Sequence, residues 1–395
     1  MTHAELKALD SQYVMNTYGR NDVDIDHGKN ATLYDLAGKE YIDFSAGIGV
    51  NSVGTANETW LAALTAQAAK LAHISNLFYT QPCVELAQKL CQRTGMARVF
   101  FGNSGAEANE GIIKTARKYS HDKYGEGRST ILTLKNSFHG RTVTTLAATG
   151  QDKLHTDFFP FTEGFRYANA NDFASVEAVA GDDVCAVMME LVQGEGGVLP
   201  LDKDFVQAVA GLCAKNDWLL LCDEVQTGVG RTGTLFAYQQ YGIQPAALSF
   251  AKGIAGGLPM GGFMVSEAYQ DVMCAGTHGS TFGGNPVAAA AGCAVLDILD
   301  DAVLAQVTEK GAYIQKAVAD MHLSCVGESR GLGLMLGFDV NEGHTNKELC
   351  TLLVNNGLLA LTAGPGLRFL PPLTITYEEI DKGLAIFKAV LEQVQ

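Results

Sequence analysis

The sequence predicts an α/β protein with a large domain, built on a mainly parallel sheet covered by helices, and a smaller α+β domain. Three observations support this fold class. Short apolar runs recur between about residues 98 and 265, stretches with helical spacing separate them, and the pattern changes after about residue 285. Strands that alternate with helices form parallel sheets covered on both faces, and such sheets bind ligands at the carboxyl ends of their strands.

The apolar runs of the large domain are expected to be buried strands. In chain order they are ARVFF, STILTL, VCAVMMEL, WLLLCDE, ALSFA and GGFMV. Intervening stretches such as AEANEGIIKTARKYS and DKDFVQAVAGLCAKND place apolar residues at helical intervals. The regular alternation of the two patterns predicts a single doubly covered sheet.

The end of the chain has a different pattern. Asn285 and Pro286 are a typical cap and first-turn residue for the alanine-rich helix that follows them. The strand-like GLGLMLGFDV and the proline-rich LRFLPPLTIT come later, and Thr376 with Glu379 has the spacing of a capping box before a last helix. The expected organisation is an N-terminal segment packing with the small domain at 1–50, a large domain at 51–285 and a small domain at 286–395.

Composition narrows the class of protein. The formal net charge of −15 argues against binding to a nucleic-acid backbone, which requires a clustered basic surface. The nine cysteines are scattered without a CxxC pair or zinc-like spacing, so we expect reduced thiols and no metal site. No stretch is long and apolar enough for a membrane span or a signal peptide. We therefore expect a cytoplasmic protein that contacts neither membrane nor nucleic acid.

Lys252 is the first candidate for chemistry. It follows the apolar run ALSF and opens into the glycine-dense GIAGGLPMGG. A lysine at the end of a buried strand can be desolvated, which lowers its pKa and makes its neutral amine a nucleophile toward an aldehyde. Most lysines are simply exposed to solvent, so the neighbouring motifs must decide whether Lys252 is a nucleophile or an ordinary solvated lysine.

Asp223 and Glu224 end another apolar run, in WLLLCDEVQTG, and three chemistries use that arrangement. A nucleoside triphosphatase would also need a GxxxxGK[ST] loop, which the chain lacks. A dinucleotide site could use GVGRTG at 228–233, yet the next carboxylate is Glu267, too far along for the ribose contact. The third reading joins Asp223 to Lys252 in one cleft, as pyridoxal 5'-phosphate (PLP) requires: a lysine for its aldehyde and a carboxylate for its pyridine nitrogen.

Further motifs fit such a cofactor. Asn103-Ser104-Gly105-Ala106 lies between a strand and a helix, where backbone N–H groups bind phosphate. SFHGRT at 137–142 offers an aromatic ring for stacking and a guanidinium for a carboxylate. GSTFGGNP at 279–286 places hydroxyl groups beside glycines before another helix. Each motif alone could equally be a capped helix, core packing or a flexible loop.

Together, NSGAEA, SFHGRT, QGEGG, LLLCDEVQTGVGRTG, AKG with GGLPMGG, GSTFGGNP and GPGLRFLPPLTIT resemble the class III, or ornithine-type, PLP-dependent aminotransferases. The resemblance runs from about residue 13 to the end of the chain. It implies fold type I of the PLP-dependent transferases, a transaminase activity and a homodimer with shared active sites. VMNTYGR and GIGVN make the chain most similar to class members that act on N2-acetylornithine.

The resemblance also implies residue roles. Lys252 would hold the cofactor aldehyde and then move the substrate proton, Asp223 would pair with the pyridine nitrogen, and Phe138 would stack on the ring. The cofactor-binding residues implied are Ser104, Gly105, Ala106, Phe138, Asp223, Glu224, Val225, Gln226, Lys252 and, from the second subunit, Thr281. The substrate-binding residues implied are Tyr18, Arg141, Glu195, Ser280 and Arg368.

The implied reaction converts N2-acetyl-L-ornithine and 2-oxoglutarate into N-acetyl-L-glutamate 5-semialdehyde and L-glutamate, a step of arginine biosynthesis. Arg141 would bind the acetylornithine α-carboxylate and Arg368 that of glutamate or 2-oxoglutarate, while Glu195 would pair with Arg368 when an amine donor is bound. Succinylornithine, succinyldiaminopimelate, ornithine, 4-aminobutyrate and a carrier-linked lysine remain alternative substrates. A PLP-binding scaffold without turnover is the alternative from another class.

The chain departs from the family pattern at two places. Many relatives have GHxHP after the early VN, whereas this chain has NSVGTANETW. Glu190-Leu191 replaces a commoner Glu-Pro. Neither place is expected to contact the cofactor, so the departures concern loop structure more than activity.

Overall fold

A seven-stranded sheet forms the centre of the larger part of the molecule in the computed structural model, which describes residues 1–394. Its strand order is β4-β12-β11-β10-β7-β5-β6, and only β12 runs antiparallel to its neighbours. The mainly parallel sheet that the sequence predicts is therefore confirmed. Its strands are β4 (Arg98–Gly102), β5 (Thr130–Leu134), β6 (Phe165–Ala168), β7 (Val184–Met189), β10 (Leu219–Asp223), β11 (Ala247–Phe250) and β12 (Gly261–Val265).

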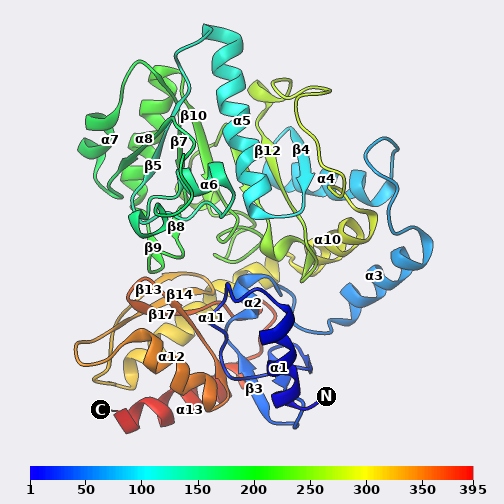
Figure 1. The fold of residues 1–395 in the computed structure, drawn as a ribbon, viewed down its shortest axis with the longest axis vertical. Helices are drawn as coiled ribbons and strands as arrows, with labels where there is room; N and C mark the ends of the chain where they lie inside the picture. The colour runs from blue at the N-terminus through cyan, green and yellow to red at the C-terminus, as the bar shows by residue number, and fades with distance from the viewer. Residues whose placement is uncertain (395) are drawn as a thin grey trace.

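Helices cover both faces of this sheet (Figure 1). Alternate residues of a strand face opposite sides, and β10 follows this rule: Leu219 and Leu221 belong to the cluster with α5, whereas Leu220 and Cys222 belong to the cluster with α8. The helices of this part are α3 (Glu58–Lys70), α4 (Gln81–Thr94), α5 (Gly105–Tyr124), α6 (Val143–Ala148), α7 (Phe173–Val179), α8 (Lys203–Asn216), α9 (Tyr238–Tyr241) and α10 (Pro286–Ile298).

A smaller part contains two four-stranded sheets, with orders β13-β14-β17-β16 and β1-β2-β3-β15. β3 pairs with β15, so the early chain is joined to its last third. The strands are β1 (His27–Lys29), β2 (Thr32–Tyr34), β3 (Glu40–Asp43), β13 (Val326–Leu332), β14 (Met335–Val340), β15 (Leu358–Leu359), β16 (Leu361–Ala363) and β17 (Gly366–Phe369). Its helices are α1 (His3–Tyr13), α2 (Ala46–Gly49), α11 (Asp301–Asp320), α12 (Asn346–Asn355) and α13 (Tyr377–Leu391).

Short elements complete the chain. β8 (Val192–Gln193) and β9 (Leu199–Pro200) form a two-stranded ribbon, and single 3₁₀ turns are η1 (Asp152–Leu154), η2 (Lys252–Ala255), η3 (Glu267–Tyr269) and η4 (Glu392–Val394). Among residues 1–394, none of the helices has the length and apolar character that crossing a bilayer demands.

Two predicted helix starts are confirmed. The Asn285 side chain accepts hydrogen bonds from the N–H groups of Val287 and Ala288, with Pro286 in the first turn of α10. Thr376 and Glu379 form a complete capping box at α13. These caps satisfy backbone donors that a helix cannot satisfy internally, which is why the local pattern could be recognised without tertiary information.

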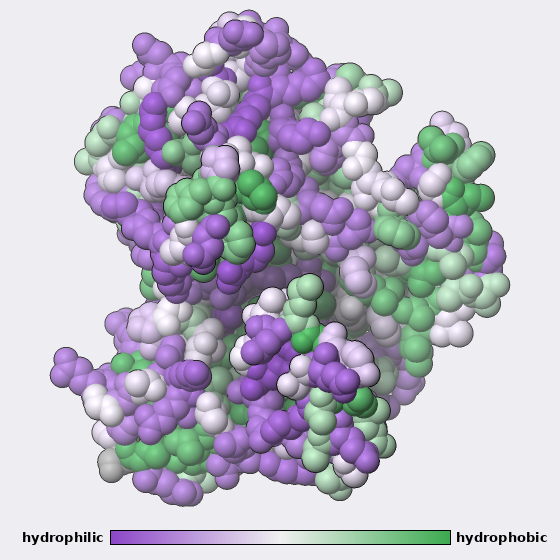
Figure 2. All heavy atoms as spheres, in the orientation of Figure 1, coloured by the Kyte–Doolittle hydropathy of each residue, from purple (hydrophilic) through white to green (hydrophobic). Residues whose placement is uncertain are grey.

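The two parts lie one above the other in Figure 1, with α1 and β3 in the same part as α12 and α13. Figure 2 shows a hollow between them, surrounded mostly by hydrophilic side chains. α10 packs against α3 and α4, on the side of the larger part. The domain boundaries at 50 and 285 stay a prediction, and the packing of α10 favours placing the second boundary after this helix.

Candidate active site

Four predicted site segments follow the carboxyl ends of strands in the large sheet. Asp223 is the last residue of β10 and is paired in register with Ser249 of β11, three residues before Lys252. Ser104 comes directly after β4, and Phe138 follows β5. Because these strands are parallel, their ends meet at one edge of the sheet. The expected position of the site at the strand ends is thus observed.

Lys252 lies in a strained stretch of backbone. Its φ of 45° is in the left-handed region, which a residue with a Cβ seldom adopts. The side chain is half-buried, and desolvation lowers the pKa of its ammonium group. Glu195 opposes this shift and Arg368 reinforces it. A lowered pKa increases the fraction of neutral amine, which is the nucleophilic and basic form.

The Asp223 carboxylate is buried and held from several sides. Asn109 of α5 donates to Oδ2 at 2.7 Å, and the backbone N–H of Val225 donates to Oδ1 at 3.0 Å. His139 Nδ1 lies 2.8 Å from Oδ2. Since a carboxylate only accepts, the imidazole donates from Nδ1. These donors fix the direction of the carboxylate.

Sequence reasoning assigned no role to Asn109 or His139. His139 lies inside the motif SFHGRT, and Asn109 also donates to the His139 carbonyl oxygen at 2.7 Å. The signal for Asn109 was its place on α5, just over one helical turn after the glycine of the phosphate motif. Both residues act on Asp223 and so hold the orientation of the predicted cofactor partner.

The start of α5 offers an anion site. A Cβ placed on Gly105 would meet the Val225 side chain at 2.7 Å, so the helix start and the segment after β10 are in close contact. The Ser104 hydroxyl caps α5 and donates to Glu107 at 2.8 Å. The first N–H groups of a helix have no partner inside it, so those of Gly105 and Ala106 are the donors left for an anion.

Phe138 and Arg141 come from the loop that follows β5. The guanidinium carbon of Arg141 lies 5.6 Å from the centre of the Phe138 ring, within the range of a cation–π contact. Phe138 is half-buried and Arg141 is exposed. This loop therefore presents a flat ring and an accessible positive charge on one side of the strand ends.

A charged pair joins the two parts of the molecule. Arg368 of β17, only 3% exposed, donates to Glu195 at 2.6 Å and to the Gln226 side-chain oxygen at 3.1 Å. Burial alone would raise the pKa of Glu195, but the Arg368 guanidinium reverses this effect and lowers it below the ordinary value. The three predicted residues thus form one cluster, and Glu195 and Arg368 both influence the Lys252 ammonium.

Glu190 is a further buried carboxyl group in this cluster. It follows β7, and the backbone N–H of Phe138 lies 3.4 Å from its Oε2. Burial, reinforced by the negative charge of Asp223, raises the pKa of Glu190 well above its ordinary value. Sequence reasoning considered this residue only as a departure in loop structure. The structure instead places it between the ring-bearing loop and the charged groups at the strand ends.

Glu224 points away from the other predicted residues. Its carboxylate accepts the N–H groups of Ala237 and Tyr238 at 3.0 and 2.7 Å, and it also accepts the Thr227 hydroxyl. Strand parity explains this direction, because Asp223 faces α5 and the next residue faces the other side of the sheet. The Glu224 side chain therefore supports a loop, leaving only its backbone near the site.

This carboxyl group gives a pH-dependence of stability. Burial raises the pKa of Glu224 from 4.5 to about 7, although its three hydrogen bonds oppose the shift. The folded protein then holds this proton more tightly than the unfolded chain, so the free energy of unfolding falls as pH rises from about 4.5 to about 7. One pKa unit is worth about 1.4 kcal/mol, and we expect a contribution of about 3 kcal/mol.

The comparison of wild type with Glu224→Gln measures this contribution. Denaturant unfolding at pH 5 and pH 7.5 should show a smaller loss of stability in the variant, because glutamine cannot ionise. Glu126→Gln, on an exposed turn, serves as the matched control. Equal pH-dependence in wild type and Glu224→Gln would contradict the expected shift.

Tyr18, Ser280 and Thr281 lie outside the central cluster. Ser280 accepts a hydrogen bond from Asn103 at 3.2 Å, next to the anion site. Thr281 and Tyr18 are exposed, and the ring of Tyr18 contacts Arg20. Within residues 1–394 no hydrogen bond joins Tyr18 or Thr281 to another predicted site residue.

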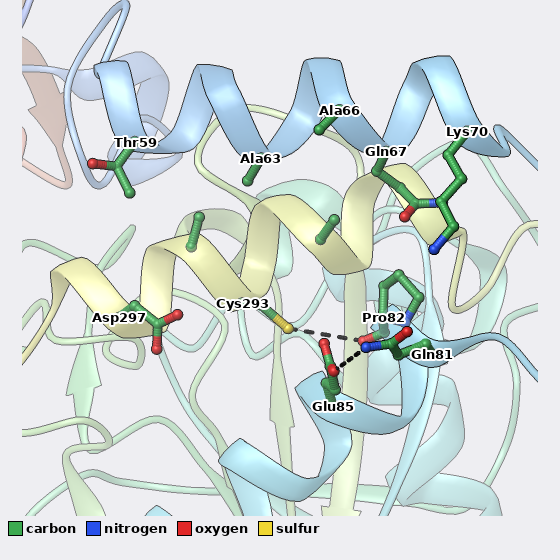
Figure 3. A pocket seen from close by; sticks show the side chains of 12 residues that line it. Thr59, Ala63, Ala66, Gln67, Lys70, Gln81, Pro82, Glu85, Cys293 and Asp297 are labelled. Atoms are coloured by element: carbon green, nitrogen blue, oxygen red, sulfur yellow. Dashed lines mark hydrogen bonds between the residues drawn. The ribbon is translucent and has the colours of Figure 1, made fainter.

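A cavity of about 430 Å³ between α3, α4 and α10 is separate from these residues (Figure 3). Gln81 donates to Glu85 at 2.6 Å inside it, and the Cys293 thiol lies 3.8 Å from the Pro82 carbonyl oxygen. No predicted site residue is among the side chains that line it. The strand ends therefore remain the candidate active site.

The geometry at the strand ends fits PLP. Lysine, carboxylate and helix start approach one another at one edge of the sheet, as the aldehyde, pyridine nitrogen and phosphate of that molecule require. Among the buried polar atoms without a partner in residues 1–394, three belong to side chains of this site, namely Asn109 Oδ1, His139 Nε2 and Arg368 Nε. Buried polar atoms normally have hydrogen-bond partners, so a polar ligand would supply the hydrogen bonds that these atoms lack.

Comparison with known proteins agrees with this fit. The family model described as aminotransferase class-III matches residues 13–391. Acetylornithine aminotransferase of Haemophilus ducreyi is 50% identical over 396 residues, covering 100% of both chains. Succinylornithine transaminase of Yersinia enterocolitica is 40% identical and covers 97% of this chain and 95% of its own.

A solved structure of ornithine aminotransferase from Toxoplasma gondii, described with partial occupancy of PLP at its active site, has a TM-score of 0.95. It is 31% identical, and the match covers 100% of this chain and 95% of that one. The chain belongs to the class-III aminotransferases and is a PLP-dependent transaminase.

Proposed function

We propose that the protein transfers the terminal amino group of N2-acetyl-L-ornithine to 2-oxoglutarate, giving N-acetyl-L-glutamate 5-semialdehyde and L-glutamate in arginine biosynthesis. The observation that carries the proposal is the full-length 50% identity to an acetylornithine aminotransferase, together with two arginines suited to two carboxylate substrates. The test is a half-reaction of the PLP-loaded protein with acetylornithine alone.

Lys252 and Asp223 are the proposed catalytic residues. When bound, PLP supplies an electron sink for the carbon that loses its proton. Lys252 would hold the cofactor aldehyde at rest. Once the substrate amine had replaced it there, the freed neutral Nζ would accept the proton from the amine-bearing carbon of the substrate and release it again. Its lowered pKa supports this function. Asp223, held by Asn109 and His139, directs its negative charge toward the pyridine nitrogen.

The remaining cofactor contacts are proposed from the resemblance to the family. Phe138 would stack on the ring, and Gln226 would bond the ring hydroxyl. The N–H groups of Gly105 and Ala106 would bind phosphate, together with the Ser104 hydroxyl once it has released Glu107. Val225, which lies against Gly105 at the start of α5, would be a further contact of the cofactor. We propose Glu224 as a contact only through its backbone, because its carboxylate is already used by Ala237 and Tyr238.

Two arginines are proposed to bind substrate carboxylates. Exposed Arg141 binds the α-carboxylate of acetylornithine, with Tyr18 and Ser280 nearby in the assembled site. Buried Arg368 binds the α-carboxylate of glutamate or 2-oxoglutarate. Glu195 neutralises Arg368 while an amine donor occupies the site, since an unpaired buried charge would be costly.

Replacing Arg368 by alanine should selectively impair the second half-reaction. Losing a charge-assisted contact to carboxylate is expected to lower kcat/KM for 2-oxoglutarate about 100-fold. The acetylornithine half-reaction should change much less. Arg98→Ala, on an exposed ion pair at the amino end of β4, is the control. If Arg368→Ala left the 2-oxoglutarate half-reaction unchanged, the assignment of this pocket would be wrong.

We further propose a homodimer in which Thr281 of one subunit reaches the phosphate of the other. The segment between α3 and α4 carries Leu77, Phe78 and Tyr79, which are 87%, 62% and 101% exposed. Asn76 ties this segment to the loop of Thr281, donating to the carbonyl oxygens of Ser280 and Gly283. Contiguous exposed apolar side chains commonly mark a protein interface.

Light scattering should therefore give twice the mass of a single chain. Phe78→Asp is expected to shift the protein toward monomer and to weaken its retention of PLP, because the second subunit no longer supplies Thr281. A fully active wild-type monomer at micromolar concentration would contradict the shared site.

An alternative substrate is N2-succinylornithine. The observation in its favour is the 40% identity to succinylornithine transaminase of Yersinia enterocolitica over nearly the full chain. The two substrates share the reacting amine and the α-carboxylate, so the residues described above serve both. Comparing their half-reaction rates distinguishes the two proposals.

A further inference from the structure

A polar cavity of about 390 Å³ lies directly beside Glu195. The residues that line it are Lys135, Asn136, Gly150, Gln151, Asp152, Lys153, Tyr167, Glu195, Gly196, Gly364 and Pro365. They come from the end of β5, the start of η1, β6 and the turn between β16 and β17. Glu195 thus has two sides: one faces the Arg368 guanidinium at 2.6 Å, and the other borders this cavity.

The other charged groups of the cavity have an excess of positive charge. Lys135 and Lys153 contribute two positive charges, and Asp152 contributes one negative charge. Among the described residues, neither lysine has an ion-pair partner within 4.0 Å. A carboxylate that entered the cavity would therefore gain electrostatic attraction and keep access to water.

The proposed reaction needs a place for such a carboxylate. A substrate carboxylate that accepts from Arg368 Nη1 would have to displace Glu195, because Glu195 already accepts from that nitrogen at 2.6 Å. A carboxylate removed from its partner and left in a buried position would be strongly disfavoured. The cost of binding the dicarboxylate therefore depends on where Glu195 moves.

The backbone around Glu195 is fixed, so the movement would be a rotation of the side chain. The N–H of Gly364 donates to the Glu195 carbonyl oxygen at 2.9 Å. A Cβ on Gly194 would meet the Gln226 side chain at 2.3 Å, and a Cβ on Gly196 would meet the Asn136 carbonyl oxygen at 2.8 Å. These close contacts hold the peptide chain on both sides of Glu195. The side chain of Glu195 is 31% exposed, so it is not packed on all sides.

We propose that this cavity receives the Glu195 carboxylate when a substrate carboxylate takes Arg368, and that Lys135 and Lys153 are specificity-determining residues for the dicarboxylate half-reaction. The inference rests on the proposed pairing of Arg368 with glutamate or 2-oxoglutarate. The lysines stabilise the displaced Glu195 and do not touch the substrate. They lower the cost of binding a dicarboxylate without affecting an amine donor that leaves the ion pair intact.

Binding of glutarate to the PLP-loaded protein tests this inference without turnover. Glutarate has two carboxylates and no reactive group, and its affinity is measured by calorimetry. The variant with Lys135→Ala and Lys153→Ala together should bind glutarate about fivefold more weakly, as expected for partly solvated ion pairs. The rate of its half-reaction with acetylornithine should stay unchanged. Lys316→Ala, at an exposed ion pair on α11, controls for the general loss of positive charge.

The Glu195→Gln background supplies the decisive comparison. Glutarate should bind more tightly to Glu195→Gln than to wild type, because no ion pair has to open. In this background the two lysine substitutions should have no effect on glutarate affinity. The same fivefold loss with and without Glu195 would mean that the lysines attract the ligand directly, which would overturn the inference. Unchanged glutarate affinity in the lysine variant would overturn it as well.

The inference about the cavity and the proposed function can fail independently of each other. If acetylornithine does not convert the PLP-loaded wild-type protein, the proposed substrate is wrong, whatever the glutarate measurements show. If acetylornithine reacts and the effect of the lysines on glutarate affinity is absent or independent of Glu195, only the inference about the cavity is wrong.

Discussion

Replacing Lys252 by alanine is expected to abolish turnover and the yellow colour of the bound cofactor. The substitution removes the amine that follows β11, and with it both the proposed covalent hold on the PLP aldehyde and the group proposed to move the substrate proton. Positioned proton transfer alone contributes about 10² to 10⁴ in rate. Steady-state assays and absorption spectra of the purified variant measure both losses.

Lys203→Ala is the matched control, because this lysine is exposed at the start of α8. It should keep full activity and colour. Small primary amines added to Lys252→Ala should restore part of the turnover, since they supply the missing base in solution. A Lys252→Ala protein with wild-type activity would rule out the proposed mechanism.

Asp223→Ala is expected to retain some PLP but to lose most catalysis. The proposed phosphate contacts at the start of α5 would remain, whereas the charge proposed to keep the pyridine nitrogen protonated would be gone. Removal of one preorganised electrostatic group commonly costs about 10² to 10³ in kcat, and we expect a loss of that size. Titration with PLP and single-turnover kinetics separate cofactor binding from chemistry.

Asp223→Asn refines this prediction. The amide keeps the size of the side chain but not its charge, so it should resemble alanine in rate and exceed it in PLP affinity. Near-normal turnover of either variant would show that the carboxylate is not needed by the pyridine nitrogen.

Local patterns were sufficient to predict six of the seven strands of the large sheet and the helix caps, whereas the edge strand β6 was missed. The apolar runs predicted the buried strands, and the capping residues Asn285 and Thr376 indicated where the helices that follow them begin. Successive side chains of a strand point to opposite faces of the sheet. Applied to β10, this rule would have predicted that Asp223 points toward α5 and that Glu224 points away from the site. Such features depend on a few neighbouring residues.

The charged cluster could not be derived from spacing. Arg368 and Glu195 are 173 positions apart and meet only because β17 packs against the strand ends of the larger part. Resemblance to the family suggested this pair. The same long-range folding places Glu190 beside Phe138 and brings Lys135 and Lys153 to one cavity, and no local pattern signals either arrangement. The roles of the site residues stay predictions, and that of Thr281 also requires a second subunit.

The half-reaction with single amines tests the central claim most directly. The PLP-loaded protein is mixed with N2-acetylornithine, N2-succinylornithine, succinyldiaminopimelate, ornithine or 4-aminobutyrate, and the visible absorbance of the lysine-bound cofactor is followed over time. N2-acetylornithine should bleach this absorbance with the highest second-order rate constant, and 2-oxoglutarate should restore it. An absorbance that acetylornithine leaves unchanged, or that ornithine or 4-aminobutyrate bleaches faster, would contradict the proposed function.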